Sequence, residues 1–383
     1  MKDEKLPDLS NLTADEINVL EAFSVFPYLP LPVKQCNAWL NADTHKTDQD
    51  NLFDALWQKG WLQKDETGYS MTPVISEVVF AKQKPVYANH MGLVKACVES
   101  LYAGAGGDFT TVEPLLPFAQ SIYEKLLRED QEVFDRLVNK IGYVSFMTGR
   151  YDAALQWYEN ARVLREKTLG KDHLTTATTY NNIAGVYDSK GDYDAALGWY
   201  EKAMAVFEKA LGKEHPSTAT AYTNIAGMHE RKGDCNAALE WLEKARVANE
   251  EVLGNEHPST AATYNNIALL YDKLGDYGAA LEWYHKALAI AEKVLGTMHL
   301  NTASTCSNIA AVHRNKGDNE AALEWYFSAM QVFLPQLGVD HPNTKAVFQS
   351  IYLAYEETGG NEDDFLPWFI ARLAEKGVEL PFA

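Results

Sequence analysis

Residues 211–216 read Leu-Gly-Lys-Glu-His-Pro, and this stretch decides the fold because it returns in phase along the chain. The pattern Leu-Gly-x-x-His occurs five times at a spacing of 42 residues. Its copies begin at Leu169, Leu211, Leu253, Leu295 and Leu337. A fixed period of this size indicates a stack of like supersecondary units, each of which buries its apolar face against its neighbours.

One unit, residues 175–215, predicts a pair of helices. One face of the first helix is formed by Tyr180, Ile183, Ala184 and Tyr187, at i, i+3, i+4 and i+7. Gly191 and Asp192 then turn the chain, and a second helical pattern runs over residues 195–207. Gly212 follows that helix at a position typical of a C-terminal cap. Each unit is therefore expected to be an αα-hairpin, and the chain an all-α solenoid.

The order of these residues resembles the tetratricopeptide repeat. The unit continues with Gly191-Asp192-Tyr193, Ala196, Tyr200 and Ala203, as that repeat does. The usual repeat has about 34 residues, whereas the form with Asn-Asn-Ile-Ala and Leu-Gly-x-x-His-Pro resembles the 42-residue kinesin light chain type. The resemblance implies a right-handed solenoid whose concave groove binds a protein or peptide and performs no catalysis.

The N-terminal region breaks the 42-residue rhythm. Two short strands around Asp65-Glu66-Thr67 predict a β-hairpin after a group of helices. The stretches 56–62 and 71–79 resemble the winged-helix segment that follows the nucleotide-binding core of NB-ARC (STAND) signalling ATPases. In those proteins a repeat sensor often comes next, and the same order is present here.

These patterns predict four parts of the chain. Residues 1–85 are expected to form a winged-helix-like domain, and residues 86–136 a helical linker or degenerate repeats. Tetratricopeptide repeats of 42 residues are expected over 137–360, and a capping helix over 361–383, because the last unit of a stack has one face in water.

The chain is strongly acidic, which bears on its partners. Its formal net charge is −19 and its pI is near 4.9, which argues against nucleic acid or an anionic membrane as the main partner. Residues 1–85 hold 8 Lys, no Arg and 13 Asp plus Glu, so the region is interpreted as a packing module rather than a DNA reader. Leu52, Leu56 and Trp57 on its third helix are interpreted as core residues.

The sequence contains no motif on which an enzyme could be built. It lacks the G-x-x-x-x-G-K-[ST] phosphate loop and a nucleophile elbow, and the glycine-rich run 104–107 is interpreted as a plain loop. The five in-phase histidines lie one unit apart, too far to share a metal ion, so we expect them to hold local hydrogen bonds in turns. No enzyme activity, metal or cofactor is expected.

Targeting signals and cysteine motifs are also missing. The four cysteines are far apart and include no C-x-x-C, and the charged first residues resemble no signal peptide. We expect a cytoplasmic protein with reduced thiols.

An asparagine recurs at one position of the first helix. This ladder consists of Asn182, Asn224, Asn266 and Asn308, preceded by a second asparagine at Asn181 and Asn265. An amide offers both a donor and an acceptor, which suits the backbone of an extended peptide. We expect these residues to line the groove; the alternative is that they only bridge adjacent helices. In the first repeat, Lys140 holds the ladder position.

Charged residues accompany the ladder on the expected concave side. The acids are Asp188, Glu230 and Asp272, and the bases beside them are Arg231 and Lys273. The acids and the net charge favour a basic or neutral peptide, although the two bases could locally reverse that preference.

The sequence thus predicts a non-catalytic scaffold that binds an extended peptide or partner segment. The alternative is the sensor half of an NB-ARC-type signalling ATPase without its ATPase core. A weaker alternative is a winged-helix transcription regulator.

Overall fold

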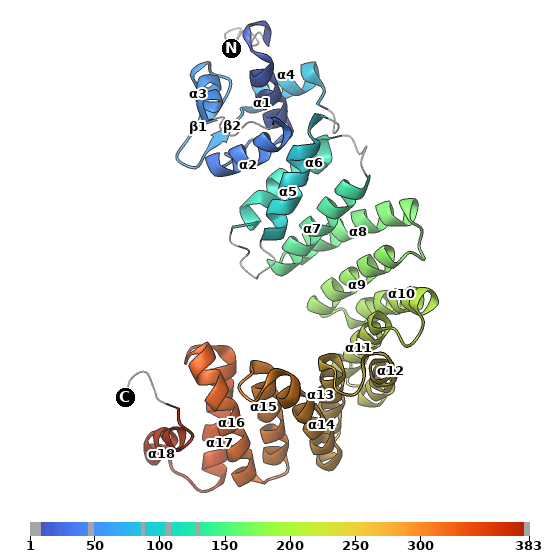
Figure 1. Ribbon diagram of the computed structural model, residues 1–383, viewed down its shortest axis with the longest axis vertical. Helices are drawn as coiled ribbons and strands as arrows, with labels where there is room; N and C mark the ends of the chain where they lie inside the picture. The colour runs from blue at the N-terminus through green and yellow to red at the C-terminus, as the bar shows by residue number, and fades with distance from the viewer. Residues whose placement is uncertain are drawn as a thin grey trace. The chain divides into compact units, whose positions relative to one another are not determined.

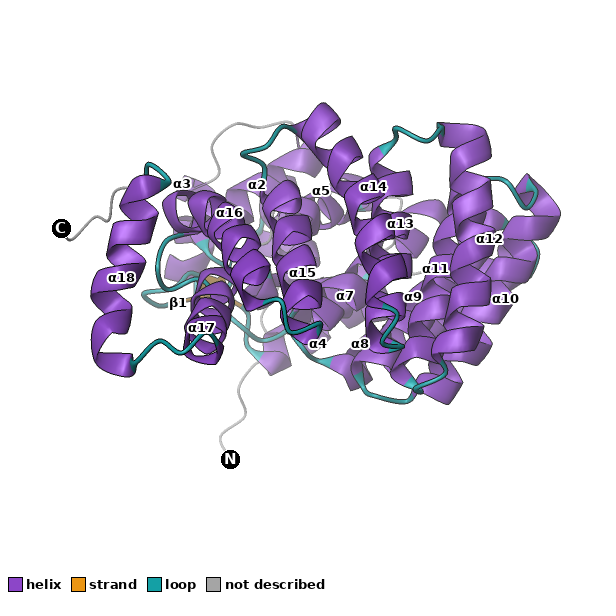
Figure 2. Cartoon of the chain, turned by 90° about the horizontal axis from the view of Figure 1, so that it is seen from below, coloured by secondary structure: helices purple, strands orange, loops and turns teal. Residues whose placement is uncertain are grey.

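The computed structural model describes residues 9–44, 50–85, 89–103, 109, 111–126 and 131–378. These residues are helical almost throughout, and strand is confined to residues 63–64 and 69–70 (Figure 2). The chain divides into two compact units, Met1–Lys190 and Gly191–Ala383. The prediction of an all-α fold is confirmed.

The first unit opens with a group of helices and a β-hairpin. Its elements are η1 (Leu9–Asn11), α1 (Ala14–Val25), α2 (Val33–Thr44), α3 (Asp50–Gln58), β1 (Gln63–Lys64), β2 (Tyr69–Ser70) and α4 (Pro73–Gln83). A capping box starts α1, because Thr13 accepts from the Glu16 N–H and Glu16 accepts from the Thr13 N–H. The strands pair antiparallel, with Gln63 opposite Ser70. The predicted hairpin is therefore confirmed, and Leu31 adds an antiparallel bridge to Tyr69.

Aromatic side chains fill the core of this group. Phe26 packs edge-on against Trp39, with ring centroids 5.9 Å apart, and both are fully buried. Leu56 is buried as predicted and Leu52 is half-buried. The interpretation of Trp57 as core is wrong: its side chain is 41% exposed, and the Lys64 ammonium lies 5.3 Å from its ring.

The rest of the first unit consists of longer helices. They are α5 (Met91–Ala103), η4 (Glu113–Leu115), α6 (Leu116–Lys125), α7 (Gln131–Met147), α8 (Tyr151–Thr168) and α9 (Leu174–Ser189). Buried side chains of all the helices from α1 to α8 belong to one apolar cluster. The glycine-rich run 104–107 lies outside the described residues.

The second unit is a regular stack. Its elements are α10 (Tyr193–Leu211), α11 (Pro216–Arg231), α12 (Cys235–Leu253), α13 (Pro258–Lys273), α14 (Tyr277–Leu295), α15 (Leu300–Asn315), α16 (Asn319–Leu337), α17 (Pro342–Glu357) and α18 (Glu362–Glu375). The first helices α11, α13, α15 and α17 have 16 residues, and the second helices α10, α12, α14 and α16 have 19. Helices α13 to α17 lie side by side in chain order (Figure 1).

Small residues let the helices of this stack approach closely. Ala268 of α13, Ala280 of α14 and Ala310 of α15 are fully buried in one cluster. Aromatic rings fill the end of the stack, where Phe327 of α16 packs on Trp368 and Phe369 of α18. The apolar residues that recur at helical spacing in the sequence therefore lie where the helices meet.

Candidate peptide-binding crevices

The in-phase histidine fixes the start of each first helix. In five repeats the imidazole Nδ1 accepts a hydrogen bond from the backbone N–H two residues later, at 3.1–3.2 Å. The five N-caps are His173, His215, His257, His299 and His341. This side-chain acceptor satisfies one of the free N–H groups of the first turn. The expectation that these histidines hold local hydrogen bonds is confirmed.

The glycine of the same motif fixes the end of the preceding helix. Gly254 has φ 87° and ψ 164°, a conformation that is open almost only to glycine. Its carbonyl accepts the Thr260 hydroxyl at 2.8 Å, and Thr260 is fully buried in the first turn of α13. A cap and a threonine bond therefore set the angle at which α13 leaves the turn.

In α9, α11 and α13 a tyrosine connects the first helix to the second helix before it. The Tyr264 hydroxyl on α13 donates to Glu250 of α12 at 2.7 Å, and Arg246 binds the same carboxylate. Tyr222 donates in the same way to Glu208 at 2.5 Å. These contacts fix α11 against α10 and α13 against α12.

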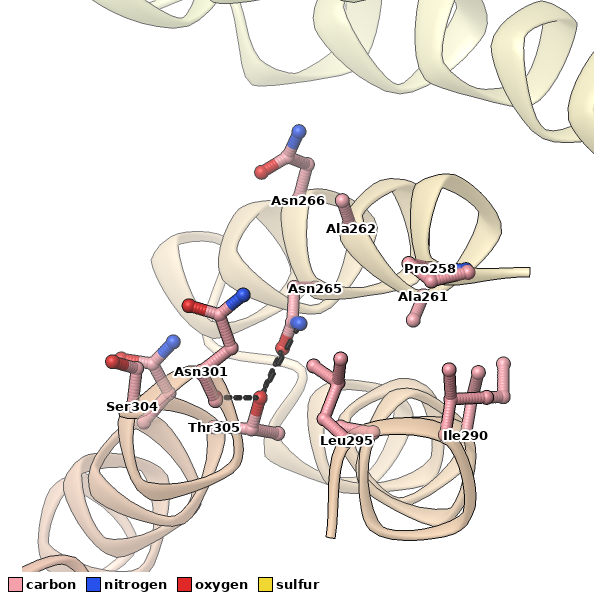
Figure 3. Close-up of a pocket in the computed structure, with 13 residues that line it drawn as sticks. Pro258, Ala261, Ala262, Asn265, Asn266, Ile290, Leu295, Asn301, Ser304 and Thr305 are labelled. Carbon is pink, nitrogen blue, oxygen red and sulfur yellow. Dashed lines mark hydrogen bonds between the residues drawn. The ribbon is translucent and has the colours of Figure 1, made fainter. Parts of the chain in front are cut away.

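Two crevices open between successive first helices of the second unit. The α13–α15 crevice has a volume of about 280 Å³ and includes Asn265, Asn266 and Asn308. Its floor comes from the last turns of α14, with Ile290 and Leu295 (Figure 3). The α11–α13 crevice, of about 210 Å³, includes Asn224 and Asn266. Asn266 therefore lines both crevices.

The ladder asparagines differ in how they are engaged. Asn266 is half-buried, and its amide makes no hydrogen bond within the described part of the chain. Figure 3 shows it pointing away from the residues below it, beside Ala262. Asn308 is exposed, and Asn224 is half-buried. In the first unit, Asn182 instead donates to Asn139 of α7 at 3.4 Å.

Asn181 and Asn265, which directly precede two of the ladder asparagines, were also expected to line the groove. Asn265 lines the α13–α15 crevice, but its amide exchanges hydrogen bonds with the Thr305 hydroxyl of α15 at 3.4 Å (Figure 3). Asn181 is half-buried in α9. The bridging role thus applies to Asn265 and Asn182, whereas Asn266 faces an open crevice.

The charged residues beside the ladder contact neighbouring repeats. Glu230 of α11 forms an ion pair with Lys273 of α13. Asp272 accepts from the Asn315 amide at 3.0 Å. The Arg231 guanidinium lies 5.8 Å from the Tyr193 ring. Of this set, Glu230 also lines the α11–α13 crevice. Asp188 lies in α9 of the first unit, half-buried.

The apolar floor of the α13–α15 crevice was not identified from the sequence. Ile290 and Leu295 are ordinary core positions of α14 in the repeat pattern. Only the packing of α15 against the end of α14 places them below the asparagines. The recurring Leu-Gly motif was the available signal, since Leu295 belongs to it.

The described residues offer neither a metal site nor a membrane span. No three His, Cys, Asp or Glu side chains lie close enough together there to hold a metal ion. Among the same residues, none of the helices combines the length and apolarity needed to span a bilayer.

The repeat family follows from these observations and from a comparison of the sequence with family models. The model of the tetratricopeptide repeat matches residues 135–209, 189–246, 217–293 and 273–326. Together these matches cover residues 135–326, which is half of the chain. The chain belongs to the tetratricopeptide repeat family. A search of curated proteins found no match.

Solved structures of similar fold come from several kinds of protein. The apo form of the quorum sensor NprR from B. thuringiensis is 17% identical, with a TM-score of 0.55 over 87% of this chain and 83% of that chain. BtubC (BKLC) from P. vanneervenii is 22% identical, with a TM-score of 0.49 over 65% of this chain and 91% of that chain.

A third structure is a STAND protein with a tetratricopeptide repeat sensor, PH0952 from Pyrococcus horikoshii. It is 16% identical, with a TM-score of 0.49, and the match covers 90% of this chain and 54% of that chain. At these identities the similarity concerns the fold alone.

Proposed function

We propose that this protein is a non-catalytic interaction module that holds an extended segment of a partner protein in the crevices of the second unit. The observation that carries the proposal is Asn266. Its amide is half-buried, makes no hydrogen bond within the described residues, and lines both crevices. A partly desolvated amide without a partner is unfavourable, and a peptide backbone supplies both its acceptor and its donor.

The crevices suit a side chain as well as a backbone. Ile290 and Leu295 give the α13–α15 crevice an apolar floor, and the amides of Asn266 and Asn308 lie at its walls. An apolar surface with a few convergent polar groups is typical of ligand sites. An extended segment would place alternate side chains in successive crevices while its backbone passes the ladder.

The charge of the chain favours a basic or neutral segment. A net charge of −19 attracts cations over distances comparable with the Debye length, about 8 Å at physiological ionic strength. The acids beside the ladder give a weaker local signal, because Glu230 and Asp272 are already engaged by Lys273 and Asn315. We therefore propose that the field selects the class of partner and the amides hold its backbone.

The test replaces two ladder amides together. In Asn224→Ala/Asn266→Ala, each truncation removes one amide from the α11–α13 crevice without touching the buried core. We expect affinity to fall by about 1–3 kcal/mol, the scale of lost hydrogen bonds. The measurement is calorimetry with peptides selected by the wild-type protein from an array of 15-residue sequences.

A matched control is Asn315→Ala, which removes an exposed amide that bonds Asp272 and lines neither crevice. The control should bind like wild type, and circular dichroism should be unchanged in both variants. Wild-type affinity in the double variant would reject the crevices as the binding site.

A second candidate function rests on the N-terminal helices and hairpin. We propose that residues 1–85 are a winged-helix domain used for packing, and that the chain is the sensor half of an NB-ARC-type ATPase. Support comes from the order of α1 to α4 around the β1–β2 hairpin and from the bridge of Leu31 to Tyr69. The boundaries 85/86, 136/137 and 360/361 remain part of this proposal, as does a cytoplasmic location.

Two binding assays separate these two proposals from a nucleotide-binding enzyme and from a DNA-binding transcription regulator. The purified chain should bind neither ATP, since it has no phosphate loop, nor duplex DNA, since its charge is repulsive. Saturable ATP binding would contradict the non-catalytic proposal. Tight DNA binding that weakens steeply with salt would favour a transcription regulator.

A further inference from the structure

The last repeat of the second unit contains a further pocket, lined by residues of α16, α17 and α18 (Figure 1). This last-repeat pocket has a volume of about 430 Å³ and shares no lining residue with either crevice. Its walls are mainly apolar and come from all three helices, with Met330, Leu334, Phe348, Leu366 and Phe369. Two of these side chains are open to solvent, since Phe348 is 37% exposed and Leu366 55%.

The equivalent place in an earlier repeat is charged. A notch of about 340 Å³ beside α10, α11 and α12 includes Glu208 and Tyr222, which share a hydrogen bond. Three periods of 42 residues later, the same two positions hold Leu334 and Phe348.

Two other repeats also have the hydrogen-bonded pair. Tyr180 donates to Glu166, and Tyr264 donates to Glu250. The last repeat therefore replaces a polar pair, which connects two helices elsewhere in the stack, with two apolar side chains that face a pocket.

A lysine also distinguishes the last repeat. Lys345 lines the pocket and stands where the four preceding repeats have a buried alanine, at Ala177, Ala219, Ala261 and Ala303. Its ammonium pairs with Asp340 at 2.9 Å, and both side chains are exposed. Such an exposed pair contributes little, and an ammonium has three N–H donors. Lys345 can therefore bind a second carboxylate at the rim of the pocket.

A third difference concerns Thr344, the residue before Lys345, which also lines the pocket. Thr344 is buried, and its hydroxyl makes no hydrogen bond within the described part of the chain. In the four preceding repeats the equivalent hydroxyl donates to a glycine carbonyl at 2.8–2.9 Å, from Thr176, Thr218, Thr260 and Thr302. A buried hydroxyl without a partner is unfavourable, so the last repeat has an unsatisfied polar group beside its apolar walls.

We propose that the last-repeat pocket binds a small monocarboxylate with a hydrocarbon tail. The tail lies against Leu334, Phe348 and Leu366, and the carboxylate meets the ammonium of Lys345. An apolar cavity with a few polar groups is typical of small-molecule sites, whose volumes are roughly 300–1,000 Å³. This site is separate from the crevices and does not depend on the proposed binding of a partner segment.

The experiment measures binding of straight-chain acids to the full-length chain by calorimetry. The ligands are butyrate, hexanoate and octanoate, with octanamide as the uncharged match of the longest acid. Affinity should rise by about fourfold for each added methylene group, the scale of apolar burial. Octanamide should bind about threefold more weakly than octanoate, because an exposed charge pair contributes little.

Four variants assign the site. Leu366→Ser changes an exposed wall residue and should weaken octanoate binding by about tenfold. Val247→Ser makes a like change in the equivalent notch and should bind as wild type does. In Lys345→Met, octanoate and octanamide should bind equally. Leu334→Glu/Phe348→Tyr restores the pair of the other repeats and should abolish binding, with circular dichroism reporting the fold.

Absence of saturable octanoate binding to wild type overturns the proposal, and so does undiminished binding by Leu366→Ser. A preference for octanoate over octanamide that persists in Lys345→Met overturns it as well. A dimer seen by sedimentation for wild type but not for Leu366→Ser, without octanoate binding, would assign the apolar wall to a second copy of the chain instead.

The two proposed sites can fail separately. Asn224→Ala/Asn266→Ala should bind octanoate as wild type does, because neither residue lines the last-repeat pocket. Loss of octanoate binding in this variant, with its circular dichroism unchanged, would place the acid in the crevices and overturn the inference.

Discussion

At the scale of single residues, the imidazole of the Leu-Gly-x-x-His motif shows how one side chain sets a helix boundary. Nδ1 of His257 accepts the Ser259 N–H at 3.1 Å, as the corresponding nitrogen does in four other units. Serine or aspartate usually fills this role. Only a ring nitrogen without a proton can accept, so the structure also defines the tautomer of these histidines.

The cap makes a prediction for α13. His257→Ala removes the acceptor, so the free energy of unfolding of the α13 region should fall by about 0.5–2 kcal/mol. His257→Asn, which keeps a side-chain acceptor, should lose much less. Hydrogen exchange of the Ser259 amide measures the effect directly. Equal exchange rates in both variants would show that the imidazole does not cap the helix.

Asn265 and Asn266 differ in a way that the sequence alone did not predict. The sequence predicted that the asparagine pairs would lie on the groove side, and Asn265 and Asn266 do line one crevice. It could not tell that Asn265 meets Thr305 while Asn266 meets open space. That difference depends on the distance between α13 and α15, which local periodicity does not encode. The exposure of Trp57 was misjudged because helical periodicity does not show whether another element covers a side chain.

At the scale of elements, the repeat follows from its turns. Gly254 ends α12 with φ 87°, and the equivalent glycines Gly212, Gly296 and Gly338 have φ between 81° and 92°. Because the sequence repeats these turns in phase, the order and pairing of helices could be predicted. The crevices could not, because each combines side chains from three or more helices.

Two glycine substitutions test this view of the turns. Gly254→Ala forces a side chain into a conformation that costs about 1–3 kcal/mol, although no atom obstructs the new methyl group. Gly198→Ala, inside α10 and equally unobstructed, should stabilise by about 0.5–1 kcal/mol. Urea denaturation of both variants gives the comparison. Stabilisation by Gly254→Ala would contradict the turn geometry.

We expect the docking of the last helix to depend on pH through Glu324. Glu324 of α16 binds Lys376 at 2.8 Å and also Arg372, and the hydrogen bond from Lys376 is the main reason why the pKa of Glu324 lies below its ordinary value. A lowered pKa means that this stabilisation is complete above the unfolded-state value, about 4.3, and is lost as pH falls through the folded-state value.

We therefore expect hydrogen exchange in α18 to accelerate below about pH 4.3, by an amount that corresponds to less than about 1 kcal/mol because the pair is partly exposed. The acceleration is to be corrected for the intrinsic pH dependence of exchange. In Glu324→Gln the added acid sensitivity should be absent. If this variant shows the same sensitivity as wild type, the carboxylate is not its source.

At the scale of the whole molecule, charge and architecture point to the same class of partner. The family match shows a tetratricopeptide repeat protein, and such stacks present extended surfaces rather than enclosed pockets. A net charge of −19 disfavours polyanions as partners. We propose that the crevices between first helices hold the partner segment.

Filling one crevice with a bulky side chain should block the partner segment. Ala262 is exposed on α13 and lines the α13–α15 crevice, so Ala262→Trp occupies the site without disturbing the core. Glu282→Trp adds the same ring to α14, outside both crevices. By calorimetry with the selected peptides, Ala262→Trp should bind at least about tenfold more weakly, and Glu282→Trp should match wild type. Undiminished binding by Ala262→Trp, with its circular dichroism unchanged, would contradict the account.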